Sequence, residues 1–265
     1  MLKGFDRLSP NGLKGAPKFI FHTQPMTKLK DFTRQQLMTV STATLCTALF
    51  KKGLHHQYIQ DVRPINPGLP NMVGEAFTLR YIPAREDLNH IGVFQDPAHP
   101  QRKAVEDCPP GAVFVIDSRK DARAASAGAI LISRLMVRGV AGCVTDGGFR
   151  DSPEMAKLPF PTYHSRPAAP TNLTVHQALD INVPIGCGDA PVFPGDVIVG
   201  DAEGVVVIPA HLADEIAQEA VEMTAFEDFV TEMVQKEQRS IIGLYPPTQQ
   251  KSKDDFAAWR TKHNR

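Results

Sequence analysis

The chain has 265 residues, and its 29 Lys and Arg balance its 29 Asp and Glu, so the formal net charge at pH 7 is zero. Balanced charge without a long run of one sign argues against a nucleic-acid partner or an acidic membrane surface. The length allows a sizeable buried core, as one large domain or as a domain with extensions. We therefore expect a small-molecule partner.

The sequence carries no targeting signal that we can identify. The first seven residues hold no apolar segment of signal-peptide length, and no apolar run approaches the ~18 to 20 residues that span a bilayer. The cysteines are widely spaced, without a Cys-x-x-Cys pair or a His at ligand spacing, which favours buried reduced thiols over a zinc site or disulfides. We expect a soluble, cytoplasmic protein that does not enter a membrane. The cysteines are Cys46, Cys108, Cys143 and Cys187.

Three segments are expected along the chain. Residues 1–36 form an N-terminal arm, because the sequence to about residue 29 is rich in Lys, Pro and Gly and lacks periodicity. Such an arm either has no fixed structure or docks on a neighbouring subunit. Residues 37–245 form the main domain, and residues 246–265 form a charged C-terminal tail.

Helices are expected over residues 40–53, 124–138 and 212–237. The first has Ser and Thr capping candidates, apolar residues at helical spacing, and lysines followed by a glycine at its end. The second opens with small residues, and the third is a long amphipathic pattern.

Strands are expected wherever short apolar runs are bounded by Gly, Pro or Asp. The last two form a β-hairpin, and residues 87–110 and 159–170 are expected as loops. The expected strands are 74–82, 112–116, 140–144, 181–185, 197–201 and 205–209.

An adjacent Arg-Asp pair follows the buried strand at 140–144 and the turn at 146–148. A carboxylate beside a guanidinium, at the mouth of a buried strand, can hold a divalent cation with Asp151 and an oxyanion with Arg150. The alternative is a surface ion pair. The free amides at the small-residue start of the preceding helix make an anion seat, unless the small residues serve only tight packing.

In this order and spacing, the motifs of the chain resemble those of the RraA-like family, which includes 4-hydroxy-4-methyl-2-oxoglutarate aldolase. The resemblance runs from about residue 37 to residue 245. It is carried by Pro110-Gly111, Gly128-Ala129-Ile130-Leu131, Arg138-Gly139-Val140-x-Gly142, Asp146-Gly147-x-x-Arg150-Asp151, Pro194-Gly195-Asp196 and Asp201-x-x-Gly204-Val205-Val206-Val207-Ile208-Pro209.

The resemblance implies an α/β fold, a swivelling β/β/α sandwich like the phosphohistidine domain. It implies a homotrimer or a dimer of trimers (a homohexamer), with active sites between subunits. The implied activity is a divalent-metal-dependent carbon-carbon lyase on a 2-keto acid, by retro-aldol cleavage or β-keto acid decarboxylation, which releases pyruvate through an enolate. The cation and a guanidinium would stabilise that enolate.

The resemblance also assigns residues to this chemistry. Asp151 holds Mg²⁺ or Mn²⁺, largely through water, and Arg150 binds the keto acid. Glu227, with Glu222 as the alternative, supplies a second carboxylate from the neighbouring subunit. The substrate carboxylate is received by the backbone amides of Gly128, Ala129, Ile130 and Leu131.

One position departs from the family pattern. An acidic residue that orients a water, the base for the C4 hydroxyl in retro-aldol cleavage, is replaced by Ala129. Decarboxylation of a β-keto acid such as oxaloacetate removes no hydroxyl proton, so it should survive this loss better. If a substitute base exists, the candidates are His164, Asp189 and Asp117.

Two other functions stay open at this point. Some members of the family bind and inhibit a ribonuclease without catalysis, and Ala129 is compatible with such a regulator of a protein partner. A 2-keto-3-deoxy sugar-acid aldolase or dehydratase is the third interpretation, because its substrate shares the pyruvoyl end. Divalent-metal dependence of a turnover separates the enzymes from the binding protein.

Overall fold

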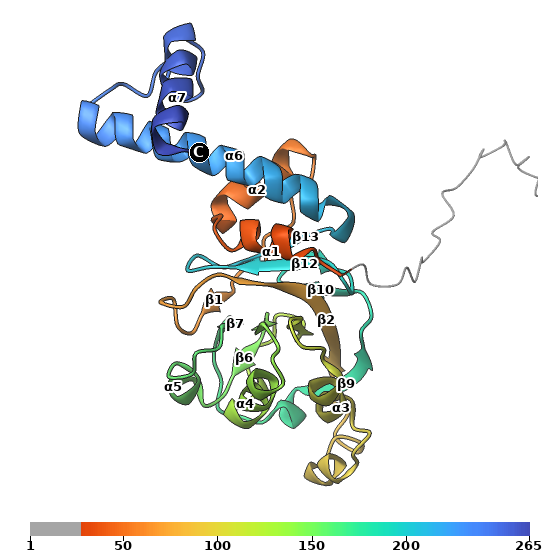
Figure 1. Cartoon of the computed structure of the whole chain (residues 1–265). Helices are drawn as coiled ribbons and strands as arrows, with labels where there is room; N and C mark the ends of the chain where they lie inside the picture. Colours follow the sequence, from red (N-terminus) through yellow and green to blue (C-terminus); the bar gives the residue numbers. More distant parts are fainter. Residues whose placement is uncertain (1–27) are drawn as a thin grey trace, which may run out of the picture.

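The computed structural model describes residues 28–265, so most of the predicted arm lies outside the described residues. An eight-stranded sheet, in the order β1-β7-β5-β3-β2-β12-β13 with β9 also paired to β2, forms the centre (Figure 1). Its strands are β1 (Arg63–Pro64), β2 (Met72–Pro83), β3 (Val113–Asp117), β5 (Gly142–Thr145), β7 (Thr162–His164), β9 (His176–Ile181), β12 (Val197–Gly200) and β13 (Val205–Ile208). The predicted strands at 74–82, 112–116 and 140–144 and the hairpin are confirmed.

Helices cover the sheet in two groups (Figure 1). On one side lie α1 (Asp31–Leu37), α2 (Thr42–Lys51) and α6 (Ala213–Glu237); on the other lie α3 (Pro100–Asp107), α4 (Ala129–Val137) and α5 (Ser152–Met155). Each group has its own apolar core against the strands. The predicted first helix is confirmed, because Ser41 caps α2 by accepting a hydrogen bond from the Thr44 amide at 3.1 Å.

Smaller elements complete the fold. The strands β4 (Ala125–Ala127), β6 (Gly148–Phe149) and β8 (Arg166–Pro167) pair in parallel, and β10 (Ile185–Cys187) and β11 (Ala190–Val192) form a hairpin. In the described part of the chain, 3₁₀ turns occur at η1 (Ile91–Gln95), η2 (Asn172–Thr174) and η3 (Ala210–Leu212).

The predicted helix at 124–138 was wrong in its first turn. Residues Ala125–Ala127 form β4, and the helix begins only at Ala129. The buried Ser126 hydroxyl lies 2.7 Å from the hydroxyls of both Ser118 and Thr145. This tertiary pairing outweighs the helical preference of the small residues.

Three other predictions also need correction. The strand predicted at 181–185 is broken, because β9 ends at Ile181 and Asn182 has a φ of 57°, which an extended strand does not allow. The loop predicted at 87–110 contains η1 and α3, and the loop at 159–170 contains β7 and β8. A proline at the first position of α3 suits a helix start.

The C-terminal part of α6 extends beyond the sheet, and α7 (Gln250–His263) packs against it (Figure 1). The predicted helix at 212–237 is confirmed as α6, and the charged segment from Pro246 includes this additional helix. The indole Nε1 of Trp259 donates to Glu232 Oε2 at 2.8 Å, and its ring joins a small apolar cluster around Phe229. This cluster is separate from the cores that cover the sheet.

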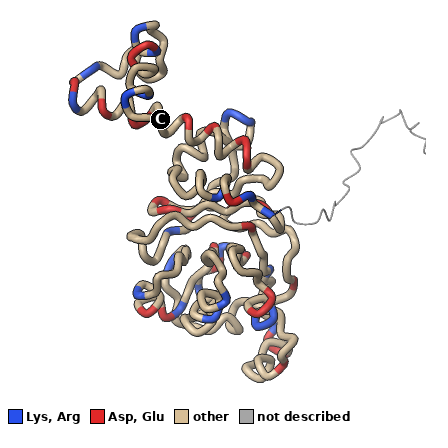
Figure 2. The backbone as a smooth tube through the Cα atoms, viewed as in Figure 1, with Lys and Arg blue, Asp and Glu red and all other residues tan. Residues whose placement is uncertain are grey.

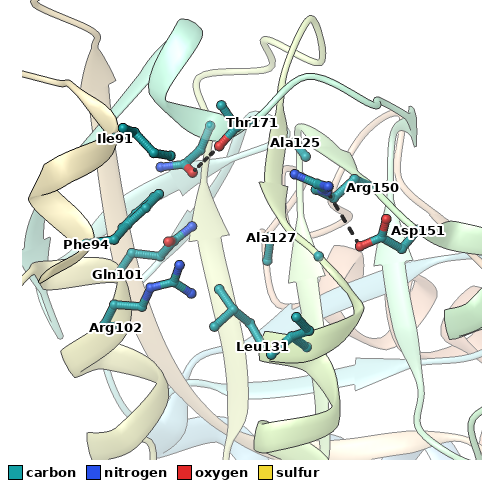
Figure 3. Close-up of a pocket in the computed structure, with 13 residues that line it drawn as sticks. Ile91, Phe94, Gln101, Arg102, Ala125, Ala127, Leu131, Arg150, Asp151 and Thr171 are labelled. Atoms are coloured by element: carbon teal, nitrogen blue, oxygen red, sulfur yellow. Dashed lines mark hydrogen bonds and ion pairs between the residues drawn. The ribbon is translucent and has the colours of Figure 1, made fainter.

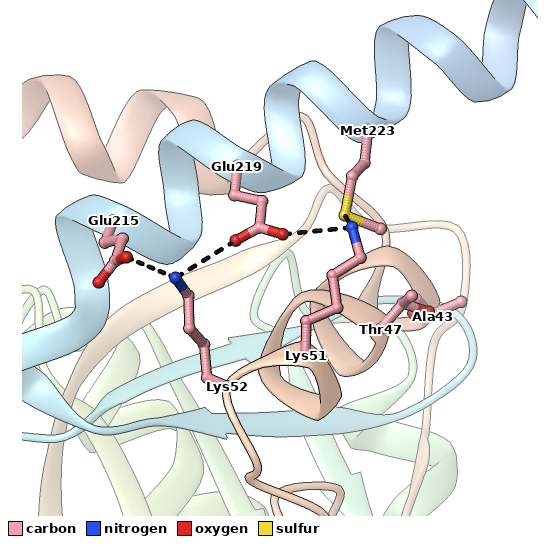
Figure 4. Close-up of polar contacts among 7 residues, drawn as sticks. All are labelled: Ala43, Thr47, Lys51, Lys52, Glu215, Glu219 and Met223. Carbon is pink, nitrogen blue, oxygen red and sulfur yellow. Dashed lines mark hydrogen bonds and ion pairs between the residues drawn. The ribbon is translucent and has the colours of Figure 1, made fainter. Parts of the chain in front are cut away.

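Ion pairs fix the other half of α6 on α2 (Figure 4). Lys51 Nζ lies 3.2 Å from Glu219 Oε1, while Lys52 pairs with Glu215 and lies 3.8 Å from Glu219 Oε2. Each exposed pair contributes little on its own. Over the described residues both signs of charge are distributed along the chain (Figure 2). No helix in residues 28–265 is both long and apolar enough to cross a bilayer.

Candidate functional site

A pocket of about 460 Å³ lies where the start of α4, the end of β6, α3, η1 and the start of η2 meet (Figure 3). Its size is within the range of small-molecule sites. It is lined by Ile91, Phe94, Gln101, Arg102, Ala125, Ala127, Gly128, Ile130, Leu131, Arg150, Asp151, Thr171 and Asn172. Five of the six residues predicted around the helix start and the Arg-Asp pair therefore line one cavity; the sixth, Ala129, is their direct neighbour.

The Arg-Asp pair is held at this pocket by the backbone. β6 pairs with β4, and the Arg150 amide donates to the Ala127 carbonyl at 3.1 Å. Arg150 Nε lies 3.5 Å from Asp151 Oδ2, and the two side chains remain 48% and 39% exposed. Asp151 has a φ of 60° and a ψ of 30°, an uncommon left-handed backbone that turns the chain from β6 into α5. Both charged groups can therefore reach a ligand from solvent.

At the predicted anion-binding site, the start of α4, the Ala129 amide already donates to the carboxylate of Asp151. Gly128 is the N-cap of α4, and the Ala129 amide donates to Asp151 Oδ2 at 3.2 Å. The Leu131 amide donates to the Gly128 carbonyl at 3.1 Å. The role of these amides in holding a substrate carboxylate remains a prediction, and such a ligand would compete with Asp151 for the Ala129 amide.

Gly128 is needed here because of close approach. A Cβ at this position would lie 2.8 Å from Asp151 Oδ2 and 2.9 Å from Arg150 Cγ. We predict that Gly128→Ala displaces the pair and lowers kcat/KM by up to about 10²-fold, the effect that misplacing a reactive group by about 1 Å can have. Steady-state assays of pyruvate release, with the melting temperature as a check on folding, measure this effect.

Gly186→Ala is the matched control for this variant. A Cβ at Gly186 would meet no atom within 4 Å, and Gly186 lies in β10, outside the pocket lining. The control should keep the activity of the original protein. Equal activity in the two variants would show that Gly128 does not position the Arg-Asp pair.

A buried carboxylate supports the loop that leads to the pair. Asp146, predicted only as a turn residue, accepts hydrogen bonds from the amides of Ser118, Lys120 and Gly188 at 2.7, 3.0 and 3.2 Å. Burial raises the pKa of Asp146, and the three amides act in the opposite direction. Asp146 therefore joins the segments that follow β3, β5 and β10, and it does not line the pocket.

From the sequence, substrate specificity is expected in loops such as 87–110 and 159–172, but the residues that form the other wall of the pocket were not identified. Gln101, Arg102 and Phe94 come from the segment predicted as a loop, and Asn172 comes from the segment after β8. The sequence signal for helix α3 was Pro100, a residue that suits a helix start, followed by the apolar Ala104 and Val105 at helical spacing. Gln101 Nε2 donates to Tyr81 Oη at 3.0 Å and to the Ser126 carbonyl at 2.8 Å, which anchors α3 beside the pocket.

None of the three candidate substitute bases lines this pocket. His164 is buried against Phe149, and burial lowers its pKa to about 4. Asp189 is exposed and pairs with Lys120, while burial raises the pKa of Asp117 to about 6 at the end of β3. The chain therefore does not bring these groups to its own Arg-Asp pair.

The two carboxylates expected from a neighbouring subunit lie on α6, away from the pocket. Glu227 Oε2 accepts a hydrogen bond from Thr44 Oγ1 at 2.8 Å, and Glu222 pairs with Arg260 of α7 at 2.6 Å. Their contribution to an active site between subunits remains a prediction. Asp151 is thus the one carboxylate that the described residues place in the lining.

The model of the RraA-like family, described as Aldolase/RraA, matches residues 42–207, which is more than half of the chain. The chain belongs to the Aldolase/RraA family. The matched region contains the helix start, the Arg-Asp pair and both walls of the pocket. The family membership inferred from the motifs is confirmed.

Relatives within the Aldolase/RraA family carry two kinds of name. A protein of Halalkalibacterium halodurans, provisionally named 4-hydroxy-4-methyl-2-oxoglutarate aldolase, is 37% identical over 129 residues, which are 48% of this chain. The chain spans 60% of the length of that relative. The 4-hydroxy-4-methyl-2-oxoglutarate aldolase of Thermus thermophilus is 28% identical over 151 residues, covering 57% of this chain and 90% of that one.

A solved structure extends the comparison to the fold. RraAS2 of Streptomyces coelicolor, described as an unusual member of the RNase ES inhibitor RraA protein family, is 27% identical with a TM-score of 0.68. The match covers 77% of this chain and 98% of that chain. The predicted α/β fold of the RraA-like type is confirmed.

Proposed function

We propose that this protein is a divalent-metal-dependent carbon-carbon lyase that acts on a 2-keto acid and releases pyruvate. The observation that supports this most directly is the Arg150-Asp151 pair, which lies half-exposed in a pocket beside the start of α4. The aldolase names of two relatives agree with a lyase. We favour β-keto acid decarboxylation over retro-aldol cleavage, because the described lining offers no second carboxylate to serve as a base.

The donor set at Asp151 fits a hard cation with a water-rich shell. One oxygen of the carboxylate accepts from the Ala129 amide, and the side chain is 39% exposed. A single carboxylate with several waters is the kind of site that Mg²⁺ or Mn²⁺ tolerates. Bound there, the cation would supply Lewis-acid stabilisation of negative charge on the substrate's 2-oxo oxygen. Asp151 is the residue that we propose to hold it.

Arg150 supplies the electrostatic part of the proposed reaction. Its guanidinium would bind the carboxylate and the 2-oxo oxygen of the substrate through parallel N–H donors. In decarboxylation, the bond between C3 and C4 breaks, CO₂ leaves, and the electron pair forms the enolate of pyruvate. A proton from water then adds to C3. Arg150 lowers the barrier because its charge is already in place as the enolate forms.

Ala129 defines which of the two lyase reactions should be faster. We predict that Ala129→Glu raises retro-aldol cleavage of 4-hydroxy-4-methyl-2-oxoglutarate relative to decarboxylation of oxaloacetate, by about 10²-fold or more if the new carboxylate acts as a general base. Position 129 is the first residue of α4, where an acidic side chain also suits the helix dipole. Pyruvate release from both substrates, in both proteins, gives the ratio.

The control for this ratio is a variant in which an acidic residue is introduced outside the pocket. Ala156→Glu lies after α5 and outside the pocket lining, so it should leave the ratio unchanged. An unchanged ratio in Ala129→Glu would contradict our explanation of the missing base.

The proposed function itself is tested by pyruvate release with Mg²⁺ or Mn²⁺ and again with a chelator. Metal-dependent release supports the lyase. A protein that binds a ribonuclease or another protein partner and releases no pyruvate would instead be a regulator, the role indicated by the description of RraAS2. Turnover of a 2-keto-3-deoxy sugar acid alone would favour the third interpretation.

A trimer or dimer of trimers is part of this proposal. Ile130 and Val137 on α4 and Ile91 on η1 are large apolar side chains that are 84%, 73% and 73% exposed. Two of them line the pocket. Side chains of this kind at the mouth of a site agree with its closure by a neighbouring subunit, which could bring Glu227.

A further inference from the structure

The pocket contains a second guanidinium that the proposed reaction does not use. Arg102 extends from α3 and lies across the pocket from Arg150 (Figure 3). Its Cζ lies 4.3 Å from the centre of the Phe94 ring, so a cation–π contact fixes the side chain. Within residues 28–265, Arg102 has no carboxylate within ion-pair distance. The cation is therefore held in place without a protein anion.

An unpaired amide lines the same pocket. Asn172 is only 5% exposed, and its Nδ2 has no hydrogen-bond acceptor in the described part of the chain. Its Oδ1 accepts from Thr171 Oγ1 at 3.3 Å, which leaves the amino group as the free end. A buried donor without an acceptor is costly, and most such groups in proteins have a partner. An acceptor atom of a ligand in the pocket would complete this group.

We propose that Arg102 and Asn172 form a second anion subsite, which binds a carboxylate at the distal end of the 2-keto acid substrate. This inference rests on the proposed function, in which Arg150 and Asp151 bind the 2-keto acid end. In oxaloacetate the distal carboxylate is the group that leaves as CO₂, and there the subsite would orient the C3–C4 bond for cleavage. A guanidinium and an amide Nδ2 are donors only, and an ionised carboxylate is an acceptor only. The hydroxyls of a sugar acid would need acceptors as well, so the two residues select a dicarboxylate over a neutral polyol chain.

The first experiment measures binding and needs no turnover. Calorimetric titration with Mg²⁺ present compares 2-oxoglutarate, which has the distal carboxylate, with 2-oxohexanoate, which has an uncharged chain. The original protein should bind 2-oxoglutarate roughly 10- to 100-fold more tightly, the range for hydrogen bonds to a charged group. Arg102→Gln should remove most of this preference and leave the affinity for 2-oxohexanoate unchanged. Asn172→Leu should reduce the preference by a smaller factor.

Lys103→Gln is the matched control, because it removes one positive charge from the next residue of α3. Lys103 is exposed, pairs with Asp107 and lies outside the pocket lining. It should keep the full preference for 2-oxoglutarate. Arg102→Lys should keep part of it, since the charge remains but the planar fork is lost. Melting temperatures check that each variant is folded.

The outcomes separate this inference from the proposed function. The second subsite would be overturned if the original protein bound the two ligands equally, or if Arg102→Gln kept the full preference for 2-oxoglutarate. It would also be overturned if neither ligand bound to the original protein. Selective binding that depends on Arg102 without any pyruvate release would support the subsite and contradict the lyase.

Discussion

Asp151→Asn is expected to abolish metal-dependent pyruvate release while the fold stays intact. The substitution removes the charge that we propose to hold the cation, and the loss in kcat should be roughly 10²- to 10³-fold or more, as for other preorganised electrostatic groups. Asn is the informative replacement because the backbone here has a φ of 60°, which Asn adopts as readily as Asp. Alanine would add backbone strain to the loss of charge.

Asp189→Asn is a close control for this variant. Asp189 is also an exposed aspartate with a positive φ, of 65°, and it pairs with Lys120 away from the pocket. Its replacement should leave turnover and its dependence on Mg²⁺ unchanged. Steady-state assays over a range of Mg²⁺ concentrations distinguish lost affinity for the cation from a lost rate. If Asp151→Asn kept full metal-dependent turnover, another group would have to hold the metal.

Arg150→Lys is the second substitution with a large expected effect. A lysine keeps the charge but offers a point donor in place of the planar fork, so it cannot hold a carboxylate and an oxo group together. We expect kcat and the affinity for substrate both to fall, with kcat/KM reduced by about 10²-fold. Steady-state kinetics on oxaloacetate at saturating Mg²⁺ measure both parameters.

Arg123→Lys provides the matching control. Arg123 forms a local pair with Asp121 at 2.6 Å, like the pair at the pocket, but its side chain is 74% exposed and lies outside the lining. Its replacement should not change the kinetics. Normal kinetics in Arg150→Lys would show that Arg150 and Asp151 form only a surface ion pair, the alternative interpretation that the sequence left open.

Elements with a strong periodic pattern were predictable from the sequence. Local sequence patterns determine three of these elements: the apolar stripe of α6, the N-cap of α2 and the apolar run of β3. Residues 125–127 do not, because Ala and Ser favour a helix and only their pairing with β6 makes them a strand. Helix α3 was also missed, since its eight residues bury only Gln101, Ala104 and Val105 and leave little apolar signal.

The candidate site was predictable to the extent that its residues are close in sequence. Arg150 and Asp151 are adjacent, and the family motif connects them to Gly128. The segments at 87–110 and 159–172 were expected to determine specificity, but the roles of Arg102 and Asn172 were not predictable, because α3 and η2 reach the pocket only through the fold. The anchoring of Gln101 by Tyr81 and Ser126 joins three segments, and no spacing in the sequence indicates such a contact.

Strand β2 imposes an order on how this chain can fold. It pairs with β3, which follows soon after it, but also with β9 and β12, which are synthesised much later. Until residues 176–200 have left the ribosome, the edge of β2 that does not pair with β3 keeps unpaired backbone N–H and C=O groups, so the first half of the chain cannot complete a sheet by itself. Fragments that stop before β12 should therefore need a chaperone or aggregate, although they contain the whole Arg-Asp pair.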